Sequence, residues 1–457
     1  MTWQIKTSLY PHQIPAVEKV LPSRVGGLFM DMGVGKSRVA IELVCIRQPK
    51  IDKAIWFCPV SLKETIRYEI EKHTNATVYV FCDDANIPVA DWYVIGIESM
   101  SMSNRVVIAV RELITDKSFV IVDESAYIKS HRAIRTQRIT RLAEKCKYRL
   151  ILTGTPITQG IQDLFAQMRF LSPKILGYHS FYSFAANHLE YSDKYPGLVI
   201  KAHNTDWLAA KIQPYIYQVS KEEAGLNLPS KLYDGWHFGL TEEQRQAYEV
   251  TKYDILMNCE ELNSYIIFQL FTALQQIVSG FRYNHDKLCE YPHKRLETLQ
   301  NIVYSIPEDK KIIIWCKYRY SVEKIVNLVP KCAKFYGDLT EQQRNDELQK
   351  FRSDCRFLVA TQATGGHGLT LNEAAYSIFY ENEFNYAHRK QAEDRNHRIG
   401  QDCQPTYIDV LSDSKIEDKI MNSLAKKGNL IKDFKSKVDK LKDKTKTEVK
   451  QFIMSEL

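Results

Sequence analysis

The stretch VGGLFMDMGVGKS, residues 25–37, decides the fold. Its first six residues form a short apolar run of the kind that is buried as a strand, and a glycine-containing loop and Gly-Lys-Ser follow directly. A strand, a tight loop and the start of a helix place backbone N–H groups and the positive end of a helix around an anion. The pattern predicts a phosphate-binding loop in which Lys36 reaches the β- and γ-phosphates and Ser37 holds Mg²⁺. Met30 stands where the full GxxxxGK[ST] pattern has its first glycine, so an ordinary strand-to-helix turn stays open.

Similar apolar runs recur along the chain, separated by stretches rich in helix formers. Before residue 160 the runs are VGGLFM (25–30), AIWFCP (54–59), WYVIGI (92–97), FVIVDE (119–124) and YRLILTG (148–154). After residue 290 they are KIIIWC (311–316), AKFYG (333–337), RFLVAT (356–361), YSIFYE (376–381) and TYIDVL (406–411). This alternation is typical of buried parallel strands joined by helices, so we expect an α/β protein with two parallel-sheet lobes.

The sequence divides into four parts. We expect a first lobe over 1–220, with a helical insertion from about residue 160, and a helical protrusion or linker over 221–290. A second lobe over 291–425 and a basic helical tail over 426–457 follow. The tail has ten lysines against five acidic residues, and its apolar residues follow helical spacing. A helix docked on a lobe and a tail that contacts DNA or a partner are both open interpretations.

The composition is that of a globular protein. The 457 residues are 44% hydrophobic and 26% charged, and the net charge of +7 permits a polyanionic partner. No apolar run approaches the roughly 18 residues of a membrane span, and no N-terminal stretch resembles a signal peptide. None of the ten cysteines forms a CxxC pair. We therefore expect reduced thiols, several of them buried, and neither a disulfide framework nor a zinc site.

A second strand ends in two adjacent carboxylates, Asp123 and Glu124, in FVIVDES (119–125). Asp123 suits a Mg²⁺ ligand, directly or through water, and Glu124 suits the base that orients an attacking water. Such a pair is also typical of a solvated strand exit, but a phosphate loop earlier in the same lobe favours nucleotide hydrolysis. LTGTP (152–156) ends a further strand, and its small hydroxyl residues can couple the γ-phosphate to loop movement.

The segment QAEDRNHRIGQ, residues 391–401, holds Arg395 and Arg398 and is too polar to be expected in a core. On a helix these arginines would lie three apart on one face. Positioned positive charge catalyses phosphoryl transfer, so we expect both to act as arginine fingers from the second lobe when the lobes close over ATP. The alternative is a surface helix whose arginines pair with Glu393 and Asp394.

Taken together, these segments resemble the motifs of superfamily 2 helicases, and specifically of the Swi/Snf-type DNA translocase family. The resemblance runs from about Leu9 to Ile420, and QAEDRNHRIGQ is its most specific match. The other matching segments are LYPHQ (9–13), DMGVGKS (31–37), CPVSLKETIRYE (58–69), DESAYIK (123–129), LTGTPITQ (152–159), GGHGLTLNEA (365–374) and IEDKI (416–420). The resemblance implies two RecA-like lobes and a nucleic-acid-dependent ATPase.

The resemblance also implies particular site residues. Gln13 would read the adenine of ATP. The remaining nucleotide contacts would come from Gly33, Gly35, Lys36, Ser37, Gly368 and Gln391, and the Mg²⁺ ligands would be Ser37 and Asp123. DNA would be gripped near Ser61, Ser99 and Gly366.

Two positions depart from the family pattern. Ile66 replaces the usual Trp, and Ala126 replaces the His that in relatives helps to link nucleotide state to the Thr-Gly-Thr loop. The replacement of this His by Ala126 would therefore affect the coupling between nucleotide state and the Thr-Gly-Thr loop. The combination of DES, GLT and QAEDR resembles the distant branch of the family, which includes annealing helicases and fork remodellers. Because no accessory module is recognisable in the sequence, we expect a nearly bare motor, as in a virus or a bacterium.

We therefore expect a monomeric, ATP-dependent translocase on double-stranded DNA, forked or branched DNA included, that remodels DNA or protein–DNA complexes. Its phosphate contacts would be largely sequence-independent. The alternative is a helicase that unwinds, anneals or branch-migrates forked DNA or RNA. A nucleic-acid-binding scaffold without ATPase activity is a third possibility. We expect no membrane partner, a cytoplasmic and nucleoid-associated location in a bacterium or in the host cell of a virus, and a part in DNA repair or recombination.

Aromatic residues in the insertion bear on the choice between these functions. Phe181, Tyr182, Phe184 and Tyr191 can stack on unpaired bases, which would favour the helicase, or can pack helices together.

Overall fold

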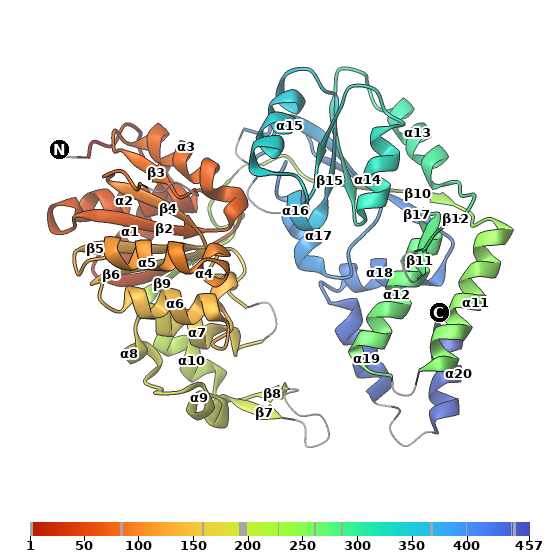
Figure 1. Cartoon of the computed structure of the whole chain (residues 1–457), viewed down its shortest axis with the longest axis horizontal. Coiled ribbons are helices and arrows are strands. Elements are labelled where there is room, and N and C mark those ends of the chain that lie inside the picture. The colour runs from red at the N-terminus through yellow and green to blue at the C-terminus, as the bar shows by residue number, and fades with distance from the viewer. Residues whose placement is uncertain are drawn as a thin grey trace. The chain divides into compact units, whose positions relative to one another are not determined.

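The computed structural model describes residues 3–82, 86–157, 160–191, 199–226, 228–259, 262–284, 287–365, 369–398, 400–439, 441 and 445–457. These residues form two compact units, which divide the chain into 1–227 and 228–457 (Figure 1). Each unit contains a large parallel sheet with helices packed on it. The two-lobed α/β fold expected from the sequence is therefore confirmed.

The first unit is built on a seven-stranded parallel sheet with the order β3-β4-β2-β5-β6-β1-β9. Its strands are β1 (Val25–Met30), β2 (Lys53–Cys58), β3 (Val78–Val80), β4 (Trp92–Gly96), β5 (Ser118–Asp123), β6 (Tyr148–Thr153) and β9 (Ile216–Val219). Every apolar run predicted before residue 160 is one of these strands. The sequence did not reveal β3 and β9, because both are short strands at the edges of the sheet and neither carries a long apolar run.

Alternate residues of each central strand face two different layers of helices. In β2, Ile55 and Phe57 belong to one hydrophobic core, whereas Ala54, Trp56 and Cys58 belong to the other, as the two-residue period of a strand requires. The helices of this unit are α1 (Ile14–Val20), α2 (Lys36–Arg47), α3 (Lys63–His73), α4 (Ser99–Met102), α5 (Asn104–Leu113), α6 (Ile134–Ala143), α7 (Asp163–Leu171), α8 (Pro173–Leu176), α9 (Phe181–His188) and α10 (Thr205–Ile212). The parallel strands bring the loops after β1, β5 and β6 to the same edge of the sheet.

The range of the expected insertion, from about residue 160, contains α7, α8, α9 and α10 and also the antiparallel hairpin β7 (Leu189–Tyr191) and β8 (Val199–Ala202) (Figure 1). Its aromatic residues divide into two groups. Phe184 is fully buried, and the ring of Phe181 stacks on His131 with 3.9 Å between centroids, so these two pack helices. Tyr182 and Tyr191 are exposed, at 72% and 38%.

The second unit contains a six-stranded parallel sheet with the order β10-β17-β16-β13-β15-β14. Its strands are β10 (Leu232–Phe238), β13 (Lys311–Cys316), β14 (Cys332–Phe335), β15 (Phe357–Thr361), β16 (Ala374–Phe379) and β17 (Thr406–Ser412). Every run predicted after residue 290 is one of these strands. Strand β10 lies inside the range that the sequence suggested was a helical linker, because LYDGWHF is a mostly exposed edge strand that contains Asp, Gly and His.

The helices of the second unit form two groups. Those that alternate with β13 to β17 along the chain are α13 (Arg295–Ser305), α14 (Arg319–Val326), α15 (Glu341–Ser353), α16 (Gln362–Gly365), α17 (Tyr386–Glu393) and α18 (Lys415–Ala425). The others are α11 (Glu242–Asn258), α12 (Ser264–Val278), α19 (Leu430–Asp439) and α20 (Lys446–Glu456), and the antiparallel hairpin β11 (Phe281–Asn284) and β12 (Lys287–Glu290) follows α12. A buried ion pair between Arg295 and Glu417 joins α13 to α18.

The basic tail packs against this second group of helices. Leu430, Phe434 and Val438 of α19 are buried in one core together with residues of α11, α12 and α18. The Lys450 Nζ of α20 donates to the carbonyl of Met257 at 3.2 Å. The structure therefore supports the docked-helix interpretation of the tail, whereas contact with DNA or a partner stays a prediction.

The described residues contain no helix with the length and apolar character that a membrane span requires. All ten cysteines are free, and five of them are buried, namely Cys45, Cys58, Cys146, Cys316 and Cys355. The expected buried thiols are therefore present.

Candidate active site

The phosphate loop joins β1 to α2 at the carboxyl edge of the first sheet. Gly33 and Gly35 have φ angles of 84° and 90°, in the left-handed region that favours glycine. Gly35 is the N-cap of α2 and contributes no side-chain bond to it. The helix therefore begins with backbone groups of the kind that bind anions, as the sequence predicted.

Lys36 is folded back over the loop that precedes it. Its Nζ donates to the carbonyl oxygen of Met30 at 2.8 Å and to that of Asp31 at 3.2 Å. The side chain is half-buried, and so is that of Ser37. The lysine that was predicted to reach phosphate is therefore held by hydrogen bonds to loop carbonyl oxygens. A bound phosphate group would replace these carbonyls as the acceptor.

Gln13 packs directly on the phosphate loop. Its Nε2 donates to the carbonyls of Val34 and Gly35, at 3.3 and 3.4 Å, and its Oε1 accepts from the Tyr10 N–H at 3.0 Å. A Cβ at Gly35 would lie 2.1 Å from the Gln13 Nε2. The side chain is 1% exposed, so the residue predicted to read adenine is here a support of the loop.

Asp123 and Glu124 occupy the end of β5, and the Glu124 N–H donates to Asp123 Oδ1 at 2.9 Å. Glu124 is in the left-handed region, with φ 49° and ψ 59°. Asp123 is 8% exposed. Burial and the neighbouring Glu124 charge raise the pKa of Asp123 to about 6, although the Lys36 charge acts to lower it. The pKa shift thus indicates that the phosphate-loop lysine and the acidic pair lie close enough to interact.

The LTGTP loop is connected in two ways to the segment Asp123–Ser125, once directly through Glu124 and once through Gln167. The Thr153 hydroxyl donates to Glu124 Oε1 at 3.1 Å and accepts the Thr155 N–H at 3.0 Å. Ser125 donates to Gln167 Oε1 at 2.7 Å, and Gln167 Nε2 donates to the carbonyl of Pro156 at 2.8 Å. Ser125 and Gln167 are both fully buried. These bonds connect the two loops at the place where Ala126 supplies no imidazole.

The sequence did not identify Gln167 as a site residue. Its only signal is one amide within the otherwise apolar stretch LFAQM of α7 (164–168). Because its partner Ser125 is 42 residues away along the chain, no local pattern connects the two.

The second unit corrects two expectations about QAEDRNHRIGQ. Helix α17 ends at Glu393, so Arg395 and Arg398 lie in the turns that follow it and not on one face of a helix. Residues 392–396 of the segment are also buried, although most of them are polar, with Arg395 2% exposed and Asn396 0%. Its polar groups bond to backbone carbonyls, which is how such groups can be buried without a large penalty.

The two arginines have different environments. Arg395 donates through Nε to the Gln391 carbonyl at 3.1 Å and through Nη1 to the Leu369 carbonyl at 3.2 Å. Arg398 is half-buried and donates to the Asp394 carbonyl and to Thr370 Oγ1, both at 2.9 Å. Gly366 and Gly368, the remaining candidates of this unit, lie outside the described residues.

The candidate DNA contacts of the first unit lie on neighbouring loops. Ser61 lies in a short 3₁₀ helix after β2, and Ser99 begins α4 after β4. The Val60 N–H donates to Glu98 Oε2 at 3.0 Å, which brings the two loops together. Because β2 and β4 are adjacent in the sheet, both serines lie at its carboxyl edge.

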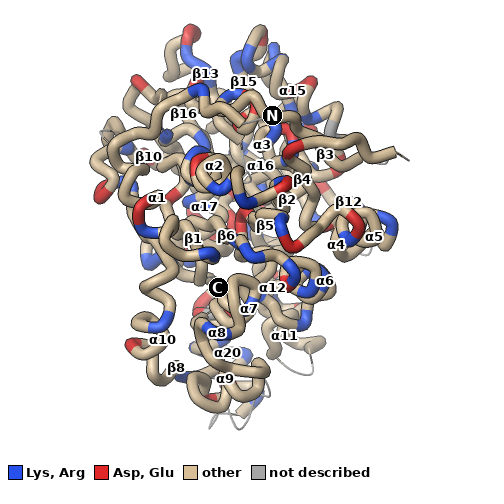
Figure 2. Tube along the Cα trace, turned by 90° about the vertical axis from the view of Figure 1, so that its left-hand side faces the viewer, with Lys and Arg blue, Asp and Glu red and all other residues tan. Residues whose placement is uncertain are grey.

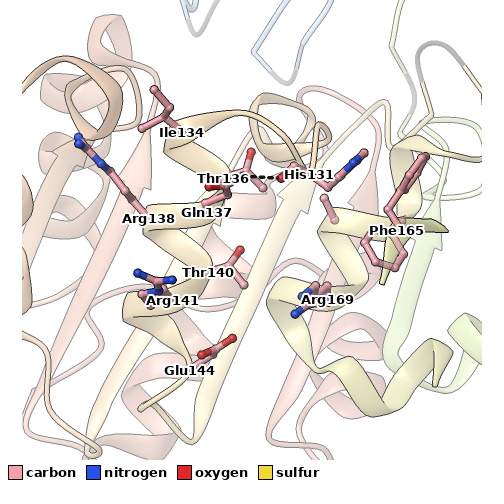
Figure 3. Close-up of a pocket in the computed structure, with 12 residues that line it drawn as sticks. His131, Ile134, Thr136, Gln137, Arg138, Thr140, Arg141, Glu144, Phe165 and Arg169 are labelled. Carbon is pink, nitrogen blue, oxygen red and sulfur yellow. Dashed lines mark hydrogen bonds between the residues drawn. The ribbon is translucent and has the colours of Figure 1, made fainter. Parts of the chain in front are cut away.

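A groove of about 500 Å³ lies between α6 and α7 (Figure 3). Its lining includes the basic residues Arg138, Arg141 and Arg169 together with Glu144. Arg138 also donates to a carbonyl of α4 at 3.0 Å, which places one end of the groove next to the Ser99 loop. Helix α6 carries three arginines and no acidic residue, and its basic character is visible in Figure 2.

The residues at the end of β1 and β5 suit ATP and Mg²⁺. The glycine at position 35 leaves no space for a side chain, and a serine hydroxyl and a carboxylate supply the oxygen ligands that Mg²⁺ prefers. Among the residues that the structure describes, no three His, Cys, Asp or Glu side chains form a metal cluster. Mg²⁺ bound with a nucleotide usually keeps several water ligands and takes others from phosphate oxygens.

A parallel sheet with a phosphate loop after β1 and an acidic pair after β5, followed by a second parallel sheet, defines a two-lobed RecA-like ATPase of helicase superfamily 2. The comparison with family models agrees with this class. Residues 12–282 match the SNF2-related domain, and residues 294–400 match the helicase conserved C-terminal domain. The chain belongs to the SNF2-related family.

Known proteins of this family resemble the chain over much of its length. An uncharacterised ATP-dependent helicase of Mycoplasma genitalium is 29% identical over 335 residues, which cover 69% of this chain and 30% of that protein. The human DNA annealing helicase and endonuclease ZRANB3 is 25% identical over 320 residues, which cover 66% of this chain and 28% of that protein. The chain thus matches about a third of the length of these relatives.

Among solved structures, the SWI2/SNF2 ATPase core of Sulfolobus solfataricus in complex with double-stranded DNA is 25% identical. The match covers 98% of this chain and 97% of the other, with a TM-score of 0.46.

Proposed function

We propose that the chain is an ATP-dependent translocase that moves along double-stranded DNA and remodels DNA or protein–DNA complexes. The observation that carries the proposal is the placement of the phosphate loop after β1 and the acidic pair at the end of β5 at one edge of the first parallel sheet, within the SNF2-related domain. A phosphate-loop lysine beside a buried acidic pair is an arrangement for hydrolysing a nucleoside triphosphate.

In this proposal the first lobe holds ATP and activates water. Lys36 exchanges its two carbonyl acceptors for phosphate oxygens, while Gln13 fixes the loop and faces the adenine. Ser37 and Asp123 hold Mg²⁺, which neutralises charge on the phosphates when bound. Glu124 accepts a proton from the attacking water, and its bond to Thr153 transmits the state of the site to the LTGTP loop.

The second lobe completes the catalytic charge when the lobes close. Arg398 is half-buried and supplies the finger, whereas the deeply buried Arg395 holds the loop at Leu369 and acts beside it. Gln391 and Gly368 contribute the remaining nucleotide contacts. Opening and closing of the lobes would then couple each hydrolysis event to a step along the duplex.

The DNA partner is proposed from the loops around Ser61 and Ser99 and from Gly366. Serine hydroxyls and loop N–H groups suit phosphate oxygens, and such contacts carry little sequence information. Arg141 and Arg169, in the basic groove that begins beside the Ser99 loop, continue this surface.

The test is the ATPase rate measured side by side with duplex DNA, single-stranded DNA, forked DNA and RNA. We expect duplex DNA to stimulate hydrolysis most, and we expect the Glu124→Gln variant to bind ATP without hydrolysing it. The proposal fails if none of the four nucleic acids stimulates the wild-type protein, because the chain would then be a binding scaffold or a different ATPase.

A second candidate function is annealing or branch migration of forked DNA. It is favoured by the similarity to ZRANB3, which is named a DNA annealing helicase, and by the exposed rings of Tyr182 and Tyr191, which can stack on unpaired bases. Stimulation by forked DNA well above that by plain duplex would favour this candidate.

A further inference from the structure

The chain passes from the first unit to the second once, after residue 227. The residues that begin the second unit, 228–233, are bonded to the segment that carries the two arginines. Lys231 Nζ lies 2.8 Å from Glu393 Oε2, and the Tyr233 hydroxyl donates to the same oxygen at 2.9 Å. His397 Nε2 donates to the carbonyl of Pro229 at 3.1 Å. We call residues 228–233 the connection between the units. The connection is therefore bonded to residues on both sides of Arg395.

The attachment is largely shielded from water. Glu393 is 7% exposed, and its second oxygen accepts from Arg389 Nε at 2.8 Å. Burial alone would raise the pKa of Glu393, but the charges of Arg389 and Lys231 lower it below its ordinary value. The carboxylate is thus held ionised between two cations, one from α17 and one from the connection.

A buried tyrosine, Tyr407, contacts both the connection and the segment that carries the two arginines. The Tyr407 ring stacks on Tyr233, with 5.4 Å between centroids, and lies 5.3 Å from Lys231 Nζ. Its hydroxyl lies 3.1 Å from the Glu393 carbonyl and 3.0 Å from Asn396 Oδ1. Displacement of Lys231 would therefore disturb the environment of the residues that flank Arg395.

The contacts continue to the proposed finger. Arg398 Nε donates to the carbonyl of Asp394, and Lys231 Nζ lies 4.0 Å from the carboxylate of the same aspartate. Lys231 is thus in contact with both Glu393 and Asp394. The Asp394 carbonyl accepts the hydrogen bond that orients Arg398.

We propose that Lys231 is a positioning residue that ties the orientation of Arg398 to the connection between the two lobes. The inference rests on the proposed function, because it assigns a role relative to the proposed finger. Strain placed on the connection as the lobes move is transmitted through Glu393 and Asp394 to the arginine. The finger is then oriented only when the connection is seated on the second lobe.

The experiment compares Lys231→Met with Lys231→Arg, which keeps the charge. The matched control is Gln404→Ala, because Gln404 Nε2 donates to Ser230 Oγ at 2.7 Å, on the same connection but away from Glu393. For each variant, kcat and the KM for ATP are measured with saturating duplex DNA, and the thermal unfolding midpoint is recorded. Tyr233→Phe is a second, milder variant, which removes the hydroxyl bond to Glu393 and keeps the ring.

We expect Lys231→Met to lower kcat by about 10- to 100-fold, the usual effect of misplacing a catalytic group slightly, while KM stays within a few-fold. Lys231→Arg should restore most of kcat, Tyr233→Phe should lower it in the same direction by less, and Gln404→Ala should behave as wild type. A kcat for Lys231→Met within twofold of wild type, or an equal loss in Gln404→Ala, overturns the inference. If Lys231→Met does not fold, the Tyr233→Phe result decides.

Arg398→Ala is measured in parallel to separate this inference from the proposed function. If Arg398→Ala keeps its kcat, the finger assignment itself fails. If Arg398→Ala is inactive and Lys231→Met is unchanged, only the coupling through the connection is wrong.

Discussion

The buried, ionised carboxylate of Asp123 should lower the free energy of unfolding, and Asp123→Asn should raise it. Burial and the Glu124 charge raise its pKa from 3.8 to about 6, so the folded state binds this proton more tightly than the unfolded state. The destabilisation is therefore absent well below pH 4, grows as the pH rises from about 4 to 6, and is constant above. A difference of about 2 pKa units corresponds to about 3 kcal/mol at pH 8, and to about half of that at pH 5.

The assay is urea unfolding of the first unit without nucleotide or Mg²⁺, at pH 5 and pH 8. Asparagine is nearly isosteric and can still accept the Glu124 N–H, so Asp123→Asn should be more stable than wild type, with the larger gain at pH 8. Asp91→Asn is the matched control, because bonds from Thr77 lower the pKa of Asp91 and the substitution should destabilise. A gain that is equal at both pH values, or a loss at pH 8, would refute the reasoning.

Four further substitutions test the nucleotide site. Lys36→Ala should abolish ATP hydrolysis while the far-ultraviolet circular dichroism spectrum stays native, because the lysine side chain is only half-buried; near-normal turnover would exclude this site. Arg398→Ala should leave ATP affinity within a few-fold and cut kcat by roughly 10³ or more. Arg395→Ala should also lower the unfolding midpoint, because Arg395 is buried. A normal kcat with weakened ATP affinity would show that both arginines bind ATP and do not act as fingers. Gly35→Ala should displace Gln13 and weaken ATP binding measured by calorimetry, because its Cβ would lie 2.1 Å from the Gln13 Nε2; unchanged affinity would show that the loop tolerates a side chain.

The strands were predictable because the sheets are buried on both faces. Runs such as KIIIWC at 311–316 are apolar throughout, and a short apolar run that separates helical stretches has few other structural solutions. The edge strand β10 lacks this signal, since most of its residues are exposed and only its pairing with β17 makes it a strand. Local sequence therefore revealed the centres of the sheets better than their edges.

The candidate site was predictable where its residues are close together in sequence. Lys36 begins α2, just after the short loop that follows β1, and Asp123 and Glu124 lie at the end of β5, so each belongs to a local pattern that indicates its chemistry. The supports of the site were not predictable, because they join residues that are far apart along the chain. Lys231 and Glu393 are separated by 162 positions.

The polarity of QAEDRNHRIGQ gave a wrong expectation for a physical reason. Charged side chains usually indicate a surface, yet Arg395 satisfies its guanidinium with the carbonyls of Gln391 and Leu369 and is buried. Only the positions of those carbonyls, which depend on the fold of the whole unit, permit this arrangement.

The central claim is that ATP hydrolysis moves the protein along intact duplex DNA. Displacement of a labelled third strand from a triplex tests it directly, with a labelled forked duplex measured in parallel and the Lys36→Ala variant as the inactive control. We predict ATP-dependent displacement of the third strand by the wild-type protein, no displacement by Lys36→Ala and no separation of the forked strands. Failure to displace the third strand while duplex DNA stimulates hydrolysis, or robust unwinding of the forked duplex, would contradict the claim.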